Sequence, residues 1–115
     1  MESTINKTRE WFIIAVNGQF VVKNLMNIRA AFDKAEQQRE NRVAVDLNNT
    51  THVDSSAITL LANFQKRLLA RGAKVIIFGV NKDIAEIFSI VGLDKIISIL
   101  SNDQFQNMIE KKIDN

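Results

Sequence analysis

The 115-residue sequence contains no cysteine and no proline, and it has a single histidine. Without cysteine the chain can form neither a disulfide framework nor a reactive thiolate. One histidine, His52, cannot build a metal site alone, so we expect no metal and no other cofactor. In the absence of proline, asparagine, aspartate and the four glycines must mark the turns.

Charge and hydropathy exclude two further classes of protein. The formal net charge is only +2, which is too small for a nucleic-acid surface unless the basic residues cluster. No apolar run approaches the about 20 residues that span a bilayer. Residues 1–4 show neither the basic start nor the apolar core of a signal peptide. We therefore expect one cytoplasmic domain over residues 1–115, without direct insertion into a membrane.

The first half of the chain alternates strand and helix patterns. Residues 11–16 are β-branched and aromatic, and Asn17-Gly18 closes them, which predicts a strand and a turn. Residues 1–8 are a candidate for a preceding strand. A helix is expected from a cap at Asn24 to about Glu40, because apolar residues recur there at helical spacing. Residues 43–47 form a short apolar strand that the polar residues 48–51 end.

The second half contains the clearest amphipathic helix. Its apolar positions are Ala57, Leu60, Leu61, Phe64 and Leu68, and Arg71-Gly72 supplies its stop signal. Lys66, Arg67 and Arg71 are assigned to a solvated face, which suits solubility or an acidic partner.

Three further elements follow this helix. Residues 74–78 predict a buried strand that ends at Gly79. A third helix after Asn81 has an apolar face and ends at Gly92, and residues 96–100 predict another strand. Ser101 to Gln104 match a capping box that opens a last helix. The apolar faces expected for these two helices are Ile84, Ile87, Phe88 and Val91, and Phe105, Met108 and Ile109.

This element order predicts an α/β fold. We expect a mixed sheet of four or five strands covered by about four helices. The expected core contains Ile14, Val16, Val45, Leu61, Phe64, Ile76, Phe78 and Phe88.

The segment Asp54-Ser55-Ser56 lies where a polar stretch enters the amphipathic helix. Aspartate and serine at this place are ordinary capping residues, and capping alone can explain them. A serine here can also carry a phosphate without unfolding the helix, because the dianion would lie against unpaired backbone N–H groups. Such a change of surface charge is what a reversible binding switch requires.

A hydrolase is a third interpretation of the same residues. His52, Asp54 and a serine would form a triad, but triad members normally come from separate segments that geometry brings together. The chain also lacks the G-x-S-x-G elbow and the glycine patterns of nucleotide sites. We therefore do not expect an enzyme.

The segment Val53 to Ile58 resembles the STAS family, which includes the bacterial anti-sigma factor antagonists. That family carries Asp-Ser-Ser/Thr-Gly-Leu at the start of its second helix. The strand at residues 43–47, the stretch at residues 87–97 and Gly18-Gln19-Phe20 also resemble family segments, in the same order. The resemblance covers nearly the whole chain and implies the STAS fold.

The resemblance implies a role for particular residues. Ser55 matches the phosphorylated serine of the family, and Ser56 is the alternative site. In the family, a serine kinase that is also an anti-sigma factor binds and phosphorylates the antagonist, and a PP2C-type phosphatase resets it. The implied partner-binding residues are Gly18, Gln19, Asn49, Asp54, Ser55, Ser56, Ala57 and Thr59. We expect a monomer that does not bind nucleic acid.

The sequence departs from the family pattern beside this segment. Ala57 replaces the usual glycine, Thr59 stands where a small residue is common, and Val21 stands where aspartate is frequent. These departures leave the choice of partner open. A non-phosphorylated STAS subunit of a stressosome or of a lipid-transport ATPase complex is the alternative function. Family members also control transcription and surface behaviours such as biofilm formation.

Overall fold

Short strands and helices alternate along the chain. The computed structural model describes residues 2–8 and 10–113, and the side chains of residues 2–8 and 10–109. Its strands are β1 (Ser3–Lys7), β2 (Phe12–Val16), β3 (Gly18–Phe20), β4 (Arg42–Asp46), β5 (Thr50–Val53), β6 (Lys74–Phe78) and β7 (Ser98–Leu100). Its helices are α1 (Leu25–Gln37), α2 (Ser55–Ala70), α3 (Lys82–Val91) and α4 (Asn102–Ile113), with the 3₁₀ turns η1 (Val22–Asn24) and η2 (Leu93–Lys95).

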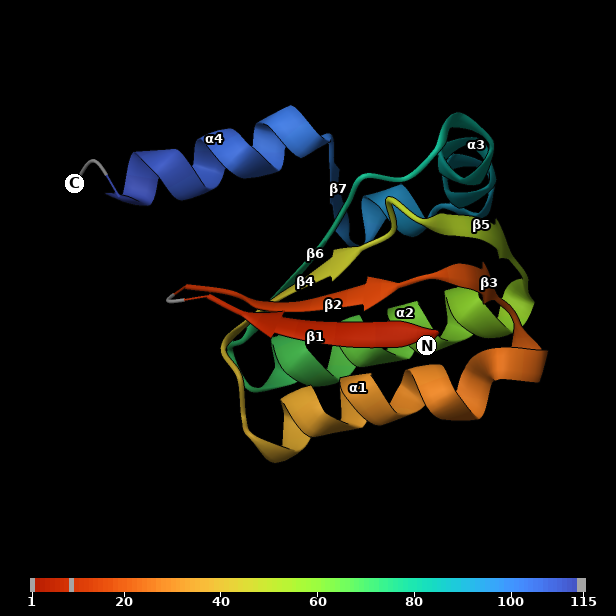
Figure 1. Cartoon of the computed structure of the whole chain (residues 1–115), viewed down its shortest axis with the longest axis horizontal. Coiled ribbons are helices and arrows are strands. Elements are labelled where there is room, and N and C mark those ends of the chain that lie inside the picture. The colour runs from red at the N-terminus through yellow and green to blue at the C-terminus, as the bar shows by residue number, and fades with distance from the viewer. Residues whose placement is uncertain (1, 9, 114–115) are drawn as a thin grey trace.

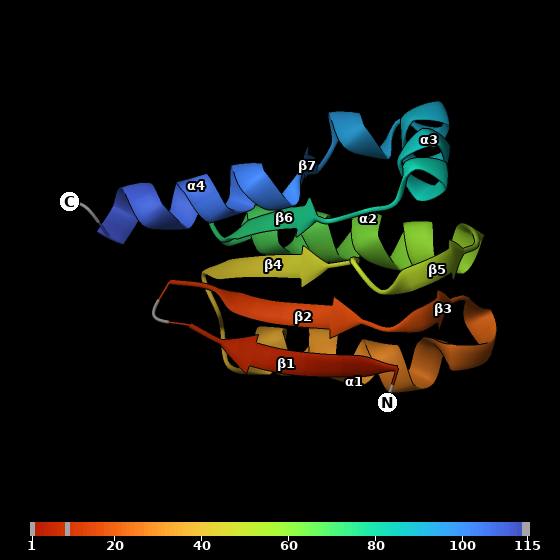
Figure 2. The ribbon, with the colours of Figure 1, turned by 45° about the horizontal axis from the view of Figure 1, so that its top comes forward.

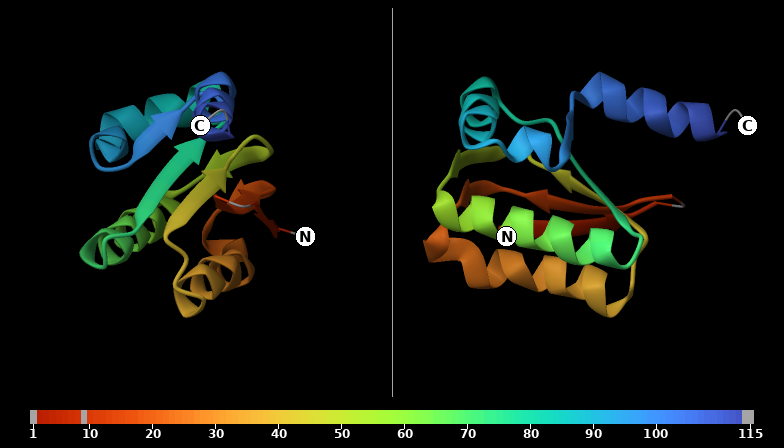
Figure 3. Two further views of the ribbon diagram at one scale, coloured as in Figure 1. Left: turned by 90° about the vertical axis from the view of Figure 1, so that its left-hand side faces the viewer. Right: turned by 180° about the vertical axis from the view of Figure 1, so that it is seen from behind.

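Five strands form one mixed sheet in the order β1-β2-β4-β6-β7. β1 runs antiparallel to β2, and the other neighbours run parallel to each other. Helices α1 and α2 lie side by side on one face of this sheet, and α4 lies on the opposite face (Figures 1 and 3). Turning the molecule shows α3 beyond the ends of β4 and β6 (Figure 2). The expected mixed sheet and four helices are confirmed.

The strands bury both faces of the sheet. Alternate residues such as Ile14, Val45 and Ile77 belong to the large cluster under α1 and α2. Ile76 and Phe78 belong to a smaller cluster under α4, where Phe78 stacks on Phe105 at a ring distance of 4.2 Å. This division follows from the alternation of side chains along a strand. All eight residues expected in the core are buried.

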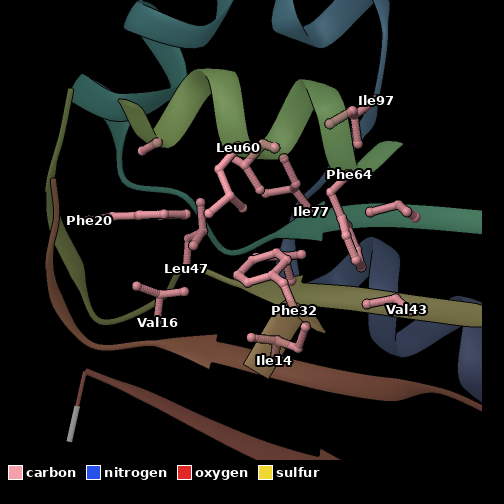
Figure 4. Packing of buried hydrophobic residues seen from close by; sticks show 14 of the residues in the cluster. Ile14, Val16, Phe20, Phe32, Val43, Leu47, Leu60, Phe64, Ile77 and Ile97 are labelled. Atoms are coloured by element: carbon pink, nitrogen blue, oxygen red, sulfur yellow. The ribbon is translucent and has the colours of Figure 1, made fainter. Parts of the chain in front are cut away.

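Aromatic rings occupy the centre of the large cluster. Phe32 of α1 meets Phe64 of α2 edge to face, with ring centroids 4.9 Å apart. Phe20 of β3 contacts Phe32 on its other side. Figure 4 shows these rings between the helices and the strands, with Leu60 and Ile77 beside them. The core thus connects both helices to β3, which precedes the loop that leads to α1.

A small second sheet was not expected. β3 and β5 pair in parallel, so the polar residues 48–51 hold a turn and the start of a strand. Thr50 is buried, and its hydroxyl donates to the Val16 carbonyl at 2.7 Å. Asn81 Nδ2 donates to the Thr50 carbonyl at 3.2 Å. The small sheet is therefore anchored to both β2 and the start of α3.

The prediction that the Asn24 side chain caps α1 was wrong. The 3₁₀ turn η1 precedes the helix, and the Asn24 side chain donates to the Gln19 carbonyl at 2.9 Å instead of capping α1. The helix also ends at Gln37 and not near Glu40. Arg39, two residues later, has a positive φ of 51° and ends the helical path.

Two further boundaries and one helix face differ from expectation. β4 begins at Arg42, one residue early, and β7 begins at Ser98, two residues later than the strand expected at residues 96–100, because residues 96–97 form a turn after η2. On α3, Ile87 and Val91 are exposed, at 38% and 52%. Only Ile84 and Phe88 are buried there, because α3 packs beside the end of the sheet and not across its face.

Candidate functional site

Asp54 connects the start of α2 to the loop after β3. Its Oδ1 accepts hydrogen bonds from the backbone N–H of Ser56 at 3.0 Å and of Ala57 at 3.2 Å, which is the expected N-cap. Its Oδ2 accepts the backbone N–H of Val22 at 3.0 Å, which the sequence did not indicate. Because the Val22 donor belongs to the backbone, no side-chain pattern could have revealed this contact. Asp54 therefore fixes the position of the 3₁₀ turn η1 beside Ser55.

The two adjacent serines have different environments. The Ser56 hydroxyl donates to Asp54 Oδ1 and is half-buried, so it belongs to the cap. Ser55 is exposed at the first residue of α2. Within the part of the chain that the structure describes, the Ser55 hydroxyl has no hydrogen-bond partner. A reagent or an enzyme can thus approach the Ser55 hydroxyl without breaking a contact of the protein.

The expected partner residues of the first loop lie in the small sheet. Gln19 of β3 is exposed and pairs with His52 of β5. The Gly18 N–H donates to the Asn49 carbonyl at 2.8 Å, and Gly18 has a positive φ of 86° that favours glycine. Asp54 N–H donates to the Phe20 carbonyl at 3.4 Å. The structure therefore brings Gly18, Gln19 and Asn49 to the same end of the molecule as Asp54.

The last two expected partner residues have opposite exposures. The Ala57 side chain is fully buried in the core, so it has no exposed surface to offer a partner. A larger side chain at this position would displace core atoms. Thr59 is exposed and lies one turn after Ser55, in the groove between α1 and α2.

This groove has a volume of about 560 Å³ and was not expected from the sequence. Ser55 and Leu25 line one end of the groove. Arg67 and Glu36 also line the groove and form an ion pair with each other at 2.7 Å. Arg71 donates to the Glu40 carbonyl at 2.8 Å. Two of the three basic residues assigned to a solvated face therefore connect α2 to α1 or to the loop after it.

The hydrogen bonds of Asp54 lower the pKa of its carboxyl below the ordinary value. The Ser56 hydroxyl is the largest cause and the Val22 N–H is the next, and they outweigh the smaller opposing effect of desolvation. Donated hydrogen bonds favour the charged form of a carboxylate, so the folded protein binds the proton less readily than the unfolded chain.

A lowered pKa predicts a dependence of stability on pH. The contribution of Asp54 should be complete above the unfolded pKa of about 3.9, and it should be lost as pH falls through the lower pKa of the folded state. In Asp54→Asn the amide oxygen can still cap α2, but no second oxygen is left for Val22. We expect Asp54→Asn to melt at a lower temperature than wild type at pH 7. The difference should shrink as pH falls below about 4 and through the lowered pKa of the folded state. A difference that stays constant as the pH is lowered from 7 to the acid limit of the fold would contradict the assignment.

The triad interpretation finds no support in the geometry. His52 is exposed on β5, and its Nδ1 lies 3.0 Å from the Thr51 hydroxyl. The Asp54 carboxylate is occupied by Val22, Ser56 and Ala57. Over the described residues there is no group of three or more side chains suited to bind a metal ion. None of the described helices is long and apolar enough to cross a membrane.

The chain resembles known proteins in its fold, whereas no curated protein matches its sequence. The structure is similar to that of a Thermotoga maritima protein described as an anti-sigma factor antagonist. The TM-score is 0.84 and the sequence identity is 18%, over 94% of this chain and 92% of that one. An anti-sigma factor antagonist from Mycobacterium paratuberculosis gives a TM-score of 0.84 at 13% identity, with the same shares covered. The phosphorylated form of the Bacillus cell fate determinant SpoIIAA gives 0.70 at 18% identity, over 93% of this chain and 98% of that one.

The sequence also matches a family model. The model described as STAS domain matches residues 2–112, which include every described strand and nearly all of α4. The mixed sheet with four helices is the fold that these solved structures share with the chain. The chain belongs to the STAS domain family.

Proposed function

We propose that this chain is a bacterial protein-binding module, similar to the anti-sigma factor antagonists, that is switched by phosphorylation of Ser55. The observation that carries the proposal is the contrast between the two serines. Ser55 is exposed and its hydroxyl has no partner among the described residues, whereas the Ser56 hydroxyl is bound to Asp54. The similarity in fold to the phosphorylated form of SpoIIAA supports the proposal. Ser56 is the alternative acceptor.

The chemistry of the switch needs no catalytic group from this chain. The Ser55 oxygen attacks the γ-phosphorus of ATP that the partner kinase holds. The bond to the leaving oxygen of ADP breaks, and a base of the kinase takes the hydroxyl proton. A phosphatase of the PP2C type reverses the step by adding water and releasing inorganic phosphate. This chain is the substrate in both reactions.

Phosphorylation would alter the binding surface and spare the fold. The phosphate adds a charge of about −1.5 to −2 at neutral pH. It would lie at the N-terminal end of α2, where unpaired N–H groups favour an anion. A kinase bound over Ser55, Gln19, Asn49 and Thr59 would lose affinity, because the new dianion must be desolvated inside the interface.

The proposal also covers the setting of the switch. The module acts as a monomer in the cytoplasm, without nucleic acid and without a cofactor, and its output is the release or capture of another regulator. The proposed output is the control of transcription or of a surface behaviour such as biofilm formation.

The isolated chain should show no catalytic turnover. We expect background rates for ester hydrolysis and for nucleotide hydrolysis, because His52 and Asp54 do not form a catalytic pair. Both activities can be measured with purified wild type and with His52→Ala. A wild-type rate above background that disappears in His52→Ala or in Ser55→Ala would restore the hydrolase interpretation.

Affinity capture from the cytoplasm of the native organism tests the proposed partner. Ser55→Ala and Ser55→Asp serve as paired baits, because they differ by one negatively charged carboxylate group at an exposed position. We expect a protein with a serine-kinase domain on Ser55→Ala and much less of it on Ser55→Asp. Subunits of a transport ATPase or of a stressosome, captured equally by both baits, would favour the non-phosphorylated alternative and overturn the proposal.

A further inference from the structure

The groove between α1 and α2 is lined by two arginines, and one of them, Arg29, forms no ion pair within the described part of the chain. Arg29 and Arg67 both line this groove. Arg67 is held by Glu36 at 2.7 Å, whereas Arg29 forms no ion pair with any residue that the structure describes. Arg29 lines the same groove as Ser55, and the two helices lie side by side over their whole length (Figure 3).

The position of Arg29 along α1 places it near the start of α2. Leu25, the first residue of α1, lines the groove with Ser55 and Ser56. Arg29 follows Leu25 by four residues, which is about 6 Å along a helix. The arginine side chain is long enough to span that distance. Asp33, an acidic residue that also lines the groove, follows Arg29 by one turn of α1 and so lies further from the start of the helix than Arg29 does.

We propose that Arg29 binds the phosphate of phosphorylated Ser55 across the groove and so connects α1 to the start of α2. This inference rests on the proposed function. The planar guanidinium matches the geometry of phosphate oxygens and can donate two hydrogen bonds to them. The carboxylate beside Ser55, that of Asp54, accepts hydrogen bonds from Val22, Ser56 and Ala57. Asp33 lies one turn after Arg29 on α1 and lines the same groove, but the two form no ion pair in the part of the chain that the structure describes.

The pairing would give phosphorylation a second effect on the surface. Arg29 would be drawn toward Ser55 and would cover the end of the groove beside Thr59. A partner segment that enters the groove of the unphosphorylated protein would then meet both a dianion and a closed end. The switch would thus act on the α1–α2 face as well as on Ser55 itself.

Phosphoserine installed at position 55 during synthesis allows a test without any kinase. The readout is the second pKa of the phosphate, about 6 for an unpaired group, followed by phosphorus NMR during a pH titration. The charged and titratable groups near the phosphate come from two places. The loops beside Ser55 supply Asp54, Lys23 of η1 and His52 of β5, and the groove supplies Arg29, Asp33 and the Glu36–Arg67 pair. We expect a value roughly 0.5–1 unit lower in wild type than in Arg29→Gln.

Two further variants make the assignment specific. Lys23→Gln removes a neighbouring positive charge and should leave the phosphate pKa as in wild type. Arg29→Lys keeps a positive charge in the groove and should show part of the lowering of the phosphate pKa that wild type shows. The same phosphate pKa in wild type and in Arg29→Gln would overturn the proposal. So would a phosphate pKa that rises in Lys23→Gln but not in Arg29→Gln. Far-ultraviolet circular dichroism shows whether each variant is folded. Because the phosphate is installed by synthesis, these results do not depend on whether a kinase modifies Ser55 in the cell.

Discussion

Replacing Ser55 by aspartate should weaken binding to the partner kinase at least about tenfold, which corresponds to about 1.4 kcal/mol. The carboxylate would place a negative charge inside the interface, where it must be desolvated without a matched partner. The fold should tolerate it, because Ser55 is exposed and a negative charge is favourable in the first turn of a helix. The melting temperature should therefore stay within a few degrees of wild type.

Isothermal titration calorimetry and thermal unfolding measure these two quantities separately. Ser89→Asp is the matched control, because it adds the same charge at an exposed serine on α3. The control should bind like wild type. Equal affinities for wild type and Ser55→Asp would contradict the switch, and a large drop in melting temperature would show that Ser55 serves the fold.

Replacing Phe64 by alanine should lower the free energy of unfolding by about 3–5 kcal/mol. Phe64 is fully buried, and its ring meets Phe32 of α1 at 4.9 Å between the two helices (Figure 4). Its removal leaves a cavity beside Phe32 that the surrounding core fills only in part. Leu61→Ala removes a smaller buried side chain of the same helix and should cost about 2–5 kcal/mol.

Urea unfolding gives these free energies, with an unchanged dependence on denaturant if the two-state behaviour is kept. Leu69→Ala is the control, because Leu69 lies on α2 but is 66% exposed. It should change the stability by less than about 0.5 kcal/mol. A Phe64→Ala variant as stable as the Leu69→Ala control would show that the phase assigned to α2 is wrong.

The elements that local patterns specify were predicted well. The spacing of apolar residues places α2 on the sheet, and the capping box of α4 forms as expected, with Ser101 Oγ accepting the Gln104 N–H at 3.0 Å. Asn81 caps α3 through the Ile84 N–H at 2.8 Å, and Gly92 ends it with a φ of 80°. The caps depend on residues within one helical turn, and the apolar spacing of α2 depends on residues of that helix alone.

The features that depend on distant partners could not be predicted. β3 and β5 are strands of three and four residues that pair with each other across about thirty positions of sequence, and neither has a strong pattern of its own. The exposed side of α3 follows from its place at the end of the sheet. An apolar helix face in the sequence cannot specify which of its residues meet the core.

The candidate site was predicted in part for the same reason. The resemblance singled out Asp54, Ser55 and Ser56, and the pattern of α2 placed them at its start. The structure adds the difference between the two hydroxyls, the contact of Asp54 with Val22, and the groove that Arg29 lines. The contact with Val22 and the groove come from the packing of η1 and α1 beside α2, which no residue pattern encodes. The difference between the hydroxyls comes from the side-chain geometry of the cap itself.

Mapping the phosphate by mass spectrometry tests the central claim most directly. Wild type, Ser55→Ala and Ser56→Ala are incubated with the partner kinase and ATP, and the modified residue is read from the fragment ions. We expect phosphate on Ser55 in wild type and in Ser56→Ala, and none in Ser55→Ala. Phosphate on Ser56 alone, with Ser55→Ala modified as fully as wild type, would contradict a switch at Ser55.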